Sequence, residues 1–280
     1  MATPVDQQRE HDTVTCVPVD RRRAQAASSP ETRRLDAVAC ETPVALVYNG
    51  VSHAVMLATP ADLYDFALGF SLTEGIIDSP DDVFDVEVKE EAQGIEVSME
   101  IASRQMQRLA EHRRSLTGRT GCGLCGAEQL SQVVRTLPVL SRESHAQRVA
   151  TAALQHARAR LRDHQPLFAE TGAVHAAAWA DTDGKILAVR EDVGRHNALD
   201  KLLGFLRCSG AAVDQGFVLV TSRASFEMVH KAASQQIALL AAISAPTSLA
   251  VETAERLGVS LIGFLRDESF SIYTHGHRIV

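Results

Sequence analysis

The sequence has no long apolar run. No stretch of about 18 consecutive apolar residues occurs in its 280 residues, and the opening residues, MATPVDQQREHDTVTC, are polar and lack the apolar core of a secretory signal. Both absences argue against a membrane-spanning or secreted protein. We therefore expect a cytoplasmic protein with no membrane partner.

Positive charge and cysteine are also scarce. The 28 Lys and Arg residues are outnumbered by 35 Asp and Glu residues, so the net charge of −7 argues against a nucleic-acid partner, while a local anion site stays compatible with it. Five irregularly spaced cysteines are too few for a disulfide framework. The length allows one large domain or two smaller ones.

The first third of the chain has mainly strand patterns. Residues 1–35 mix charged and small polar side chains without periodicity, which predicts a disordered lead-in. The Asn49-Gly50 dipeptide between two apolar runs predicts a β-hairpin within 42–60, and Thr59-Pro60 is expected to cap the helix that follows. Further expected elements are a helix over 61–75, strands over 83–90 and 94–102, and a helix over 103–116. We expect a β-rich N-terminal domain over 36–115.

The remaining chain alternates between helix and strand patterns. A long amphipathic helix is predicted over 144–168. The later strands are expected over 173–181, 186–192, 216–222, 259–265 and 270–275, and the later helices over 195–207, 225–241 and 248–257, with a short apolar run near Ile243. This alternation predicts an α/β domain over 129–280, with a mostly parallel sheet covered by helices on both faces.

Between these parts lies a glycine-rich cysteine loop, expected to be mobile over 116–128. The stretch TGRTGCGLCGAEQ places Cys122 and Cys125 two residues apart among four glycines. A zinc site normally needs two further Cys or His ligands at short spacing, and no second Cys-x-x-Cys follows. A thioredoxin-like couple normally sits between a buried strand and a helix, whereas the residues before this loop have a basic, helical pattern.

A third interpretation is a sulfur carrier, in which a cysteine takes a sulfur atom as a persulfide and delivers it elsewhere. Such a cysteine must reach two partners, which suits a glycine-rich loop, and nearby arginines would stabilise its thiolate. The second cysteine could discharge the carrier by attacking the persulfide. A flexible loop with incidental thiols is the fourth possibility, and the residues alone leave all four open.

Several longer blocks carry a family resemblance. The blocks TGCGLCG, TGAVHAAAW, REDVGRHNALDKLLG, TSRASFEMVHKAA and APTSLAVETAERLGVSLIGFLRDESFSIYTH resemble, in order and spacing, the formate dehydrogenase accessory sulfurtransferase family, FdhD. The resemblance runs from about residue 40 to the last residue. It implies a cytidine-deaminase-like, three-layer C-terminal domain beside a smaller β-rich N-terminal domain.

The resemblance also implies a function. The protein would be a sulfurtransferase that receives persulfide sulfur from a cysteine desulfurase and transfers it to the molybdenum cofactor, bis-molybdopterin guanine dinucleotide, as is required for formate dehydrogenase activity. Cys122 would carry the persulfide, with Cys125 as its partner, and the protein would be a homodimer. The alternative is a non-catalytic chaperone that binds the cofactor or the formate dehydrogenase.

Candidate cofactor-binding residues follow three strands. Arg195 and His196 lie at a strand-to-helix junction, where helix amides favour phosphate, although the same block would also suit a helix cap. Arg223 lies at a similar junction and could pair with phosphate through two hydrogen bonds. By resemblance, the segment that holds the guanine dinucleotide consists of Phe264, Leu265, Arg266, Asp267, Glu268 and Ser269.

No resident metal is expected. A zinc deaminase needs His-x-Glu and a later Pro-Cys-x-x-Cys, but the first strand of the C-terminal domain has His175-Ala176-Ala177 and no such cysteine motif follows it. A shared scaffold would therefore not bring deaminase chemistry with it.

Overall fold

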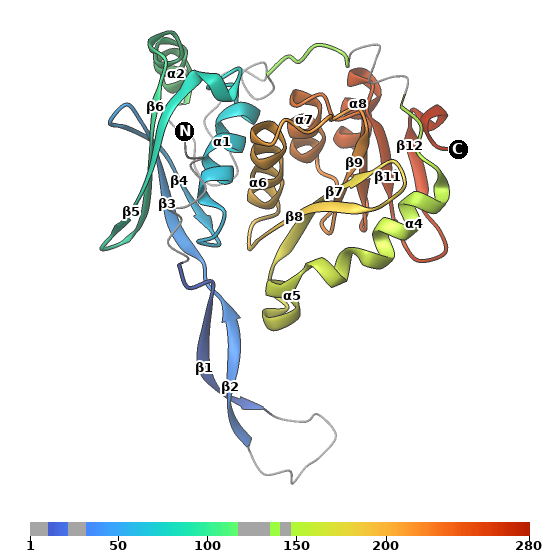
Figure 1. Cartoon of the computed structure of the whole chain (residues 1–280), viewed down its shortest axis with the longest axis horizontal. Helices are drawn as coiled ribbons and strands as arrows, with labels where there is room; N and C mark the ends of the chain where they lie inside the picture. Colours follow the sequence, from blue (N-terminus) through green and yellow to red (C-terminus); the bar gives the residue numbers. More distant parts are fainter. Residues whose placement is uncertain (1–10, 22–31, 117–134, 141–146) are drawn as a thin grey trace.

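A two-stranded ribbon, a four-stranded sheet and a six-stranded sheet follow one another along the chain (Figure 1). The computed structural model describes residues 11–21, 32–116, 135–140 and 147–280. Within those ranges, every helix is too short or too polar to span a lipid bilayer.

The ribbon consists of β1 (Val14–Arg21) and β2 (Thr32–Ala39), and it projects from the body as an arm (Figure 1). The two strands pair antiparallel from Val14 opposite Ala39 to Arg21 opposite Thr32. The prediction of a disordered lead-in over 1–35 is wrong for the described part of that range. Backbone pairing and the alternate β-branched residues of β1 favour a strand there despite the high charge.

The four-stranded sheet forms the core of the first domain. In spatial order its strands are β4 (Val51–Ala58), β3 (Thr42–Tyr48), β6 (Gly94–Ile101) and β5 (Val83–Glu91). The predicted hairpin is confirmed, because Asn49 and Gly50 connect β3 and β4 with φ values of 47° and 76°. The strands predicted over 83–90 and 94–102 are confirmed as β5 and β6. A short 3-10 helix, η2 (Pro80–Asp82), leads into β5.

Two helices complete this domain, α1 (Leu63–Thr73) and α2 (Ser103–Leu116). Helix α1 packs Phe66 and Phe70 against the sheet. Thr59 does not cap α1 as predicted: the N-cap residue is Asp62, in a left-handed conformation with φ of 52° and no side-chain cap. Thr59 instead bonds to the second domain, as described below.

The second domain is built on a mixed six-stranded sheet. In spatial order its strands are β12 (Ser271–Thr274), β11 (Ser260–Gly263), β10 (Leu239–Ala242), β9 (Gly216–Val220), β7 (His175–Asp181) and β8 (Ile186–Asp192). Only the β9–β10 and β10–β11 pairs are parallel. The prediction of a mostly parallel sheet is therefore wrong. Strand β7 is joined to β8 by a short turn and pairs antiparallel with both β8 and β9.

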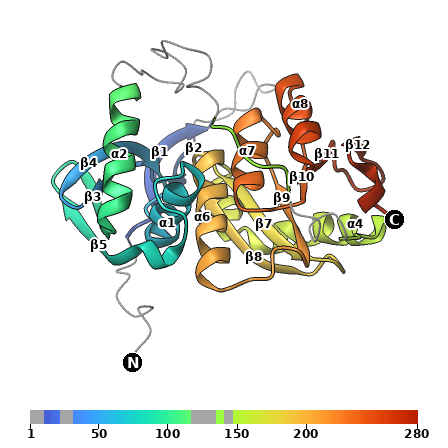
Figure 2. The same ribbon diagram turned by 90° about the horizontal axis from the view of Figure 1, so that it is seen from above.

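Helices cover both faces of this sheet (Figure 2). On one face lie α6 (Arg195–Cys208), α7 (Phe226–Ser234) and α8 (Ser248–Leu257), which pack on Trp179, Val218 and Leu240. On the other face, α4 (Thr151–Arg160) packs on the alternate strand residues, such as Phe217 and Leu239. The predicted α/β class with three layers is confirmed.

Two predicted helices end early. The helix predicted over 144–168 is instead α4, a 3-10 turn η4 (Leu161–His164) and a short α5 (Pro166–Thr171), because Pro166 cannot continue a helix from the preceding turn. The helix predicted over 225–241 stops at Ser234. Gln236 has a φ of 62°, and the apolar residues after it form the buried strand β10. A last 3-10 turn, η5 (Gly276–Arg278), closes the described chain.

Helix α1 of the first domain lies against α6 of the second (Figure 2). The two helices approach closely at Gly69 and Gly204, where an added Cβ would overlap the backbone oxygens of Asp200 and Asp65 respectively. Arg190 on β8 adds a hydrogen-bonded ion pair to Asp65 at 2.7 Å. The second domain is thus held directly against the first.

Candidate functional site

Four strands of the six-stranded sheet end at the same edge, which is formed by strand ends and not by an outer strand. Because β10 is parallel to β9 and β11 is parallel to β10, all three end at this edge. Strand β7 runs antiparallel to β9 and β8 runs antiparallel to β7, so β8 also ends there and His175 begins β7 there. We call this the carboxyl edge of the sheet. In α/β proteins such an edge is where ligands usually bind.

The structure brings the predicted cofactor-binding residues to this edge. Arg195 and His196 follow β8, Arg223 follows β9, and residues 264–269 follow β11. Neighbouring connections are joined by backbone hydrogen bonds: the Ala224 N–H donates to the Ala245 carbonyl at 3.2 Å, and the Phe264 N–H donates to the Ser244 carbonyl at 3.0 Å. Residues far apart in sequence therefore lie side by side along the carboxyl edge.

Two helices begin at the carboxyl edge without a side-chain cap. The N-cap residues are Gly194 for α6 and Ser225 for α7, and neither makes a side-chain cap hydrogen bond. The first amides of a helix have no intrahelical acceptor and carry the positive end of the helix dipole. Together with Arg195 and Arg223, these amides give the edge the chemistry of a phosphate site.

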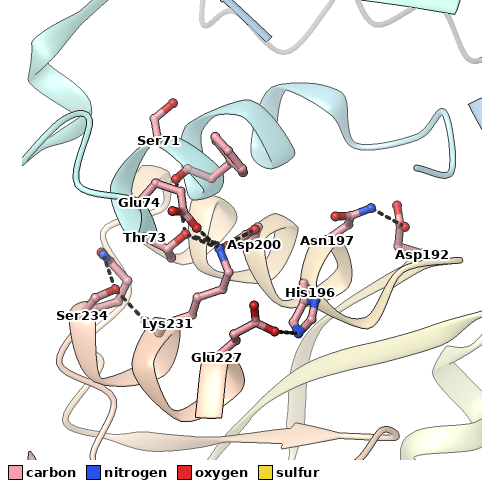
Figure 3. A network of polar contacts seen from close by, with 12 residues as sticks. Ser71, Thr73, Glu74, Asp192, His196, Asn197, Asp200, Glu227, Lys231 and Ser234 are labelled. Atoms are coloured by element: carbon pink, nitrogen blue, oxygen red, sulfur yellow. Dashed lines mark hydrogen bonds and ion pairs between the residues drawn. The ribbon is translucent and has the colours of Figure 1, made fainter. Parts of the chain in front are cut away.

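His196 and Glu227 connect the starts of α6 and α7. The His196 Nε2 lies 2.7 Å from a Glu227 carboxylate oxygen (Figure 3). This contact lowers the pKa of Glu227 below its usual value, against the effect of partial burial. Beside them, burial and the Arg195 guanidinium lower the pKa of His175 below its usual 6.5. The donors that favour an anionic ligand at this edge are thus the arginine side chains and the helix amides, while the Glu227 carboxylate is paired with His196.

The predicted segment after β11 forms a tight turn. The Arg266 N–H donates to the Ser269 carbonyl at 2.9 Å, and the Arg266 guanidinium lies 5.7 Å from the centre of the partly exposed Phe264 ring. Leu265 differs from its neighbours, because its side chain is fully buried in the core. It anchors the turn, and only its backbone can meet a ligand.

Asp267 and Glu268 are exposed in the same turn. Asp267 lies 3.7 Å from the Arg158 guanidinium on α4, and this contact leaves most of its side chain open to solvent. These carboxylates are available to accept hydrogen bonds from the N–H groups of a nucleobase.

Asp192 has a structural role. The block around Arg195 and His196 suits either a helix cap or a ligand site, and Asp192 belongs to its structural part. Its Oδ1 accepts a hydrogen bond from the Gly194 N–H at 2.7 Å, and its Oδ2 lies 2.6 Å from the Lys201 Nζ. Both side chains of this ion pair are completely buried. Lys201 was not predicted as a structural residue, although a lysine on the otherwise apolar face of the pattern DKLLGFL was a usable signal.

A second buried network, also missed, lies further along the same helices (Figure 3). The Lys231 Nζ on α7 lies 3.0 Å from Asp200 on α6, 2.9 Å from Glu74 and 2.9 Å from the Thr73 hydroxyl. Burial alone would lower the pKa of Lys231, but the two carboxylates raise it above its usual value, so the ammonium stays charged. This network joins α1 to α6 and α7.

The two cysteines of the glycine-rich loop, Cys122 and Cys125, lie outside the described residues. The described chain resumes at Arg135, whose carbonyl accepts a hydrogen bond from His230 on α7 at 2.8 Å. The Leu140 N–H then donates to the Leu257 carbonyl at the end of α8. Because α7 and α8 begin at the carboxyl edge, segment 135–140 lies towards the opposite end of these helices.

Within the described ranges, no group of three or more His, Cys, Asp or Glu side chains is arranged to bind a metal ion. A cavity of about 210 Å³ lies beside Arg135, with Leu72, Leu137 and Gln235 in its wall. It is remote from the carboxyl edge and adjoins the point where the described chain resumes.

Comparison with known proteins gives consistent matches over nearly the whole chain. Residues 39–280 match the profile of the FdhD/NarQ family. The chain is 54% identical over 259 residues to the sulfur carrier protein FdhD of Cupriavidus necator, covering 92% of this chain and 87% of the relative. It is 53% identical over 244 residues to the sulfur carrier protein FdhD of Bordetella petrii, covering 87% of each.

A solved structure supports the same fold. The crystal structure of a proposed formate dehydrogenase accessory protein from Desulfotalea psychrophila matches with a TM-score of 0.72 at 22% identity, covering 96% of this chain and 100% of that chain.

Proposed function

Because the chain belongs to the FdhD/NarQ family, we propose that it is a sulfur carrier that serves the maturation of formate dehydrogenase. One observation carries this proposal: the chain is 54% identical in sequence, over 92% of its length, to a relative named as a sulfur carrier. The match to a formate dehydrogenase accessory fold agrees with it. The partners of this role would be a cysteine desulfurase as donor and the formate dehydrogenase as client.

Sulfur loading at Cys122 needs no oxidant or reductant. The Cys122 thiolate attacks the outer sulfur of a donor persulfide, a new S–S bond forms at Cys122, and the donor's S–S bond breaks to release the donor thiolate. Cys125 can discharge the loaded cysteine: its thiolate attacks the inner sulfur of the Cys122 persulfide, the Cys122–Cys125 disulfide forms, and the persulfide S–S bond breaks to release hydrosulfide. The second cysteine would thus limit the lifetime of the carried sulfur.

The acceptor in this proposal is the molybdenum of bis-molybdopterin guanine dinucleotide, bound as a substrate at the carboxyl edge. The uncapped starts of α6 and α7, together with Arg195 and Arg223, supply donors for its phosphates. Phe264 offers a partly exposed ring for the base. The Asp267 or Glu268 carboxylate would accept hydrogen bonds from the guanine N–H groups.

A complementation experiment separates a carrier from a chaperone. Cells that lack this protein would be given the wild type or the double variant Cys122→Ala, Cys125→Ala, and formate dehydrogenase activity would be measured in extracts with equal amounts of each protein. A sulfur carrier predicts activity with the wild type only. Equal activity with the double variant would favour the chaperone that only binds the cofactor or the enzyme.

A further inference from the structure

We propose that Thr59 of the first domain is a positioning residue for the guanine-nucleotide site at the carboxyl edge. This inference rests on the proposed function and adds to it. Through Thr59, the first domain fixes the β8–α6 turn. This turn is the short connection Val193–Gly194, which orients Arg195 and His196. Thr59 itself would not touch the ligand.

Thr59 is fully buried and makes three contacts with the second domain. Its Oγ1 accepts a hydrogen bond from the Val193 N–H at 3.1 Å, and its own N–H donates to the Asp192 Oδ2 at 3.0 Å. Its carbonyl accepts a hydrogen bond from the Lys201 Nζ at 2.9 Å. One residue of the first domain therefore satisfies a donor or acceptor at each of three places around the turn.

The same turn has a second tie to the first domain. The Asn197 Nδ2 donates to the Leu57 carbonyl at 2.8 Å and lies 3.1 Å from the Asp192 Oδ1 (Figure 3). The space between these groups is already filled, because a Cβ added at Gly194 would lie 2.8 Å from the Asn197 Nδ2. Val193 and Gly194 remain partly exposed, and the hydrogen bonds from the first domain hold the turn on its buried side.

The side chains presented by this turn are the ones the proposed site needs. Arg195 and His196 are the first two residues of α6, directly after Gly194. In Figure 3, His196 points toward Glu227 on α7 rather than back into the interface. Loss of the Val193 hydrogen bond leaves the partly buried Val193 N–H without its protein acceptor and frees the turn to move. Such a movement would shift the start of α6 against α7.

Thr73 provides a matched control within the same domain interface. It lies at the other end of α1, is also buried, and its hydroxyl donates to the Asp200 Oδ1 at 2.8 Å and accepts from Lys231 at 2.9 Å. Asp200 lies in the second turn of α6 and Lys231 in the second turn of α7, away from the turn before α6. Replacement of Thr73 by Val therefore loosens the interface without touching the β8–α6 turn.

The test measures GDP affinity by calorimetry for the wild type, Thr59→Val, Thr59→Ser and Thr73→Val, at a temperature at which circular dichroism shows each variant to be folded. GDP serves as the probe because it carries the guanine and the phosphates. We expect Thr59→Val to weaken GDP binding about tenfold, which corresponds to one lost hydrogen bond of about 1.4 kcal/mol. Thr59→Ser keeps the hydroxyl and should remain within about threefold of the wild type, as should Thr73→Val.

The outcomes separate this inference from the proposed function. If the wild type binds no GDP, the guanine-nucleotide site of the proposed function is wrong and the role of Thr59 is wrong with it. If the wild type binds GDP and Thr59→Val binds it equally well, only the positioning role is overturned. Equal weakening by Thr59→Val and Thr73→Val would also overturn it, because the effect would then reflect a looser interface in general.

Discussion

The Lys201 ammonium and the Asp192 carboxylate form an ion pair at 2.6 Å in which both side chains are completely buried. The pair lies where three segments meet: the corner between β4 and α1, the end of β8 and the second turn of α6. Neutral partners complete it, because the Thr59 carbonyl accepts from Lys201 and the Gly194 N–H donates to Asp192. The pair therefore joins the two domains beside the candidate site.

Removal of one partner of this pair should be strongly destabilising. Lys201→Met leaves the Asp192 carboxylate buried without its counter-ion, which typically costs about 3–5 kcal/mol of unfolding free energy. Urea unfolding followed by tryptophan fluorescence measures this cost, since Trp179 lies in the core of the same domain. The control is Lys89→Met, because Lys89 pairs with Glu87 on the open surface of β5. Similar unfolding midpoints for both variants would contradict the structural role of Lys201.

Two histidines should make the protein less stable as the pH falls. Burial lowers the pKa of His175 and that of His230 below 6.5, so the unfolded chain takes up protons more readily than the folded one. Their contribution is complete above about pH 6.5 and is lost progressively as the pH falls below that value. Urea midpoints from about pH 7.5 down to about pH 5.5 should decrease more steeply for the wild type than for His175→Gln or His230→Gln. An identical dependence of the urea midpoint on pH in all three proteins would contradict the lowered pKa values of the two histidines.

Two arginines should each contribute to nucleotide affinity. Arg223→Ala and Arg266→Ala each remove a charged donor from the carboxyl edge, and a charged hydrogen bond to phosphate contributes about 1.5–3 kcal/mol, so each variant should bind GDP at least about tenfold more weakly. Arg207→Ala is the matched control, because Arg207 is also exposed but lies at the far end of α6. If Arg207→Ala weakens GDP binding as much, the affinity depends on the net charge of the protein and not on the residues at the carboxyl edge.

Local patterns with one dominant cause could be predicted from the sequence. The Asn49-Gly50 turn adopts the positive φ values that these residues tolerate, and β5 and β6 follow their alternating patterns. Errors arose where periodicity is ambiguous. Residues 237–242 are apolar throughout, which suits a helix continuing from α7 as well as a buried strand, and the tertiary structure selects the strand.

The candidate site was only partly predictable for a related reason. Arg195, His196 and Arg223 could be found because each follows a recognisable strand, and the end of a strand is a general place for ligands. Thr59 could not be found, because a threonine before a proline is also typical of a helix start, and its true partner Val193 is 134 residues away. Contacts of that range depend on how the domains pack, which local patterns do not encode.

The most direct test of the sulfur-carrier account is the intact mass of the protein after incubation with a cysteine desulfurase and cysteine. We expect that the wild type gains the mass of one sulfur atom, that Cys122→Ala gains nothing, and that Cys125→Ala keeps the gain. Cys208→Ala, which removes an exposed free cysteine elsewhere in the chain, should behave as the wild type does. A wild type without added sulfur, or a Cys122→Ala variant that still acquires it, would contradict the account.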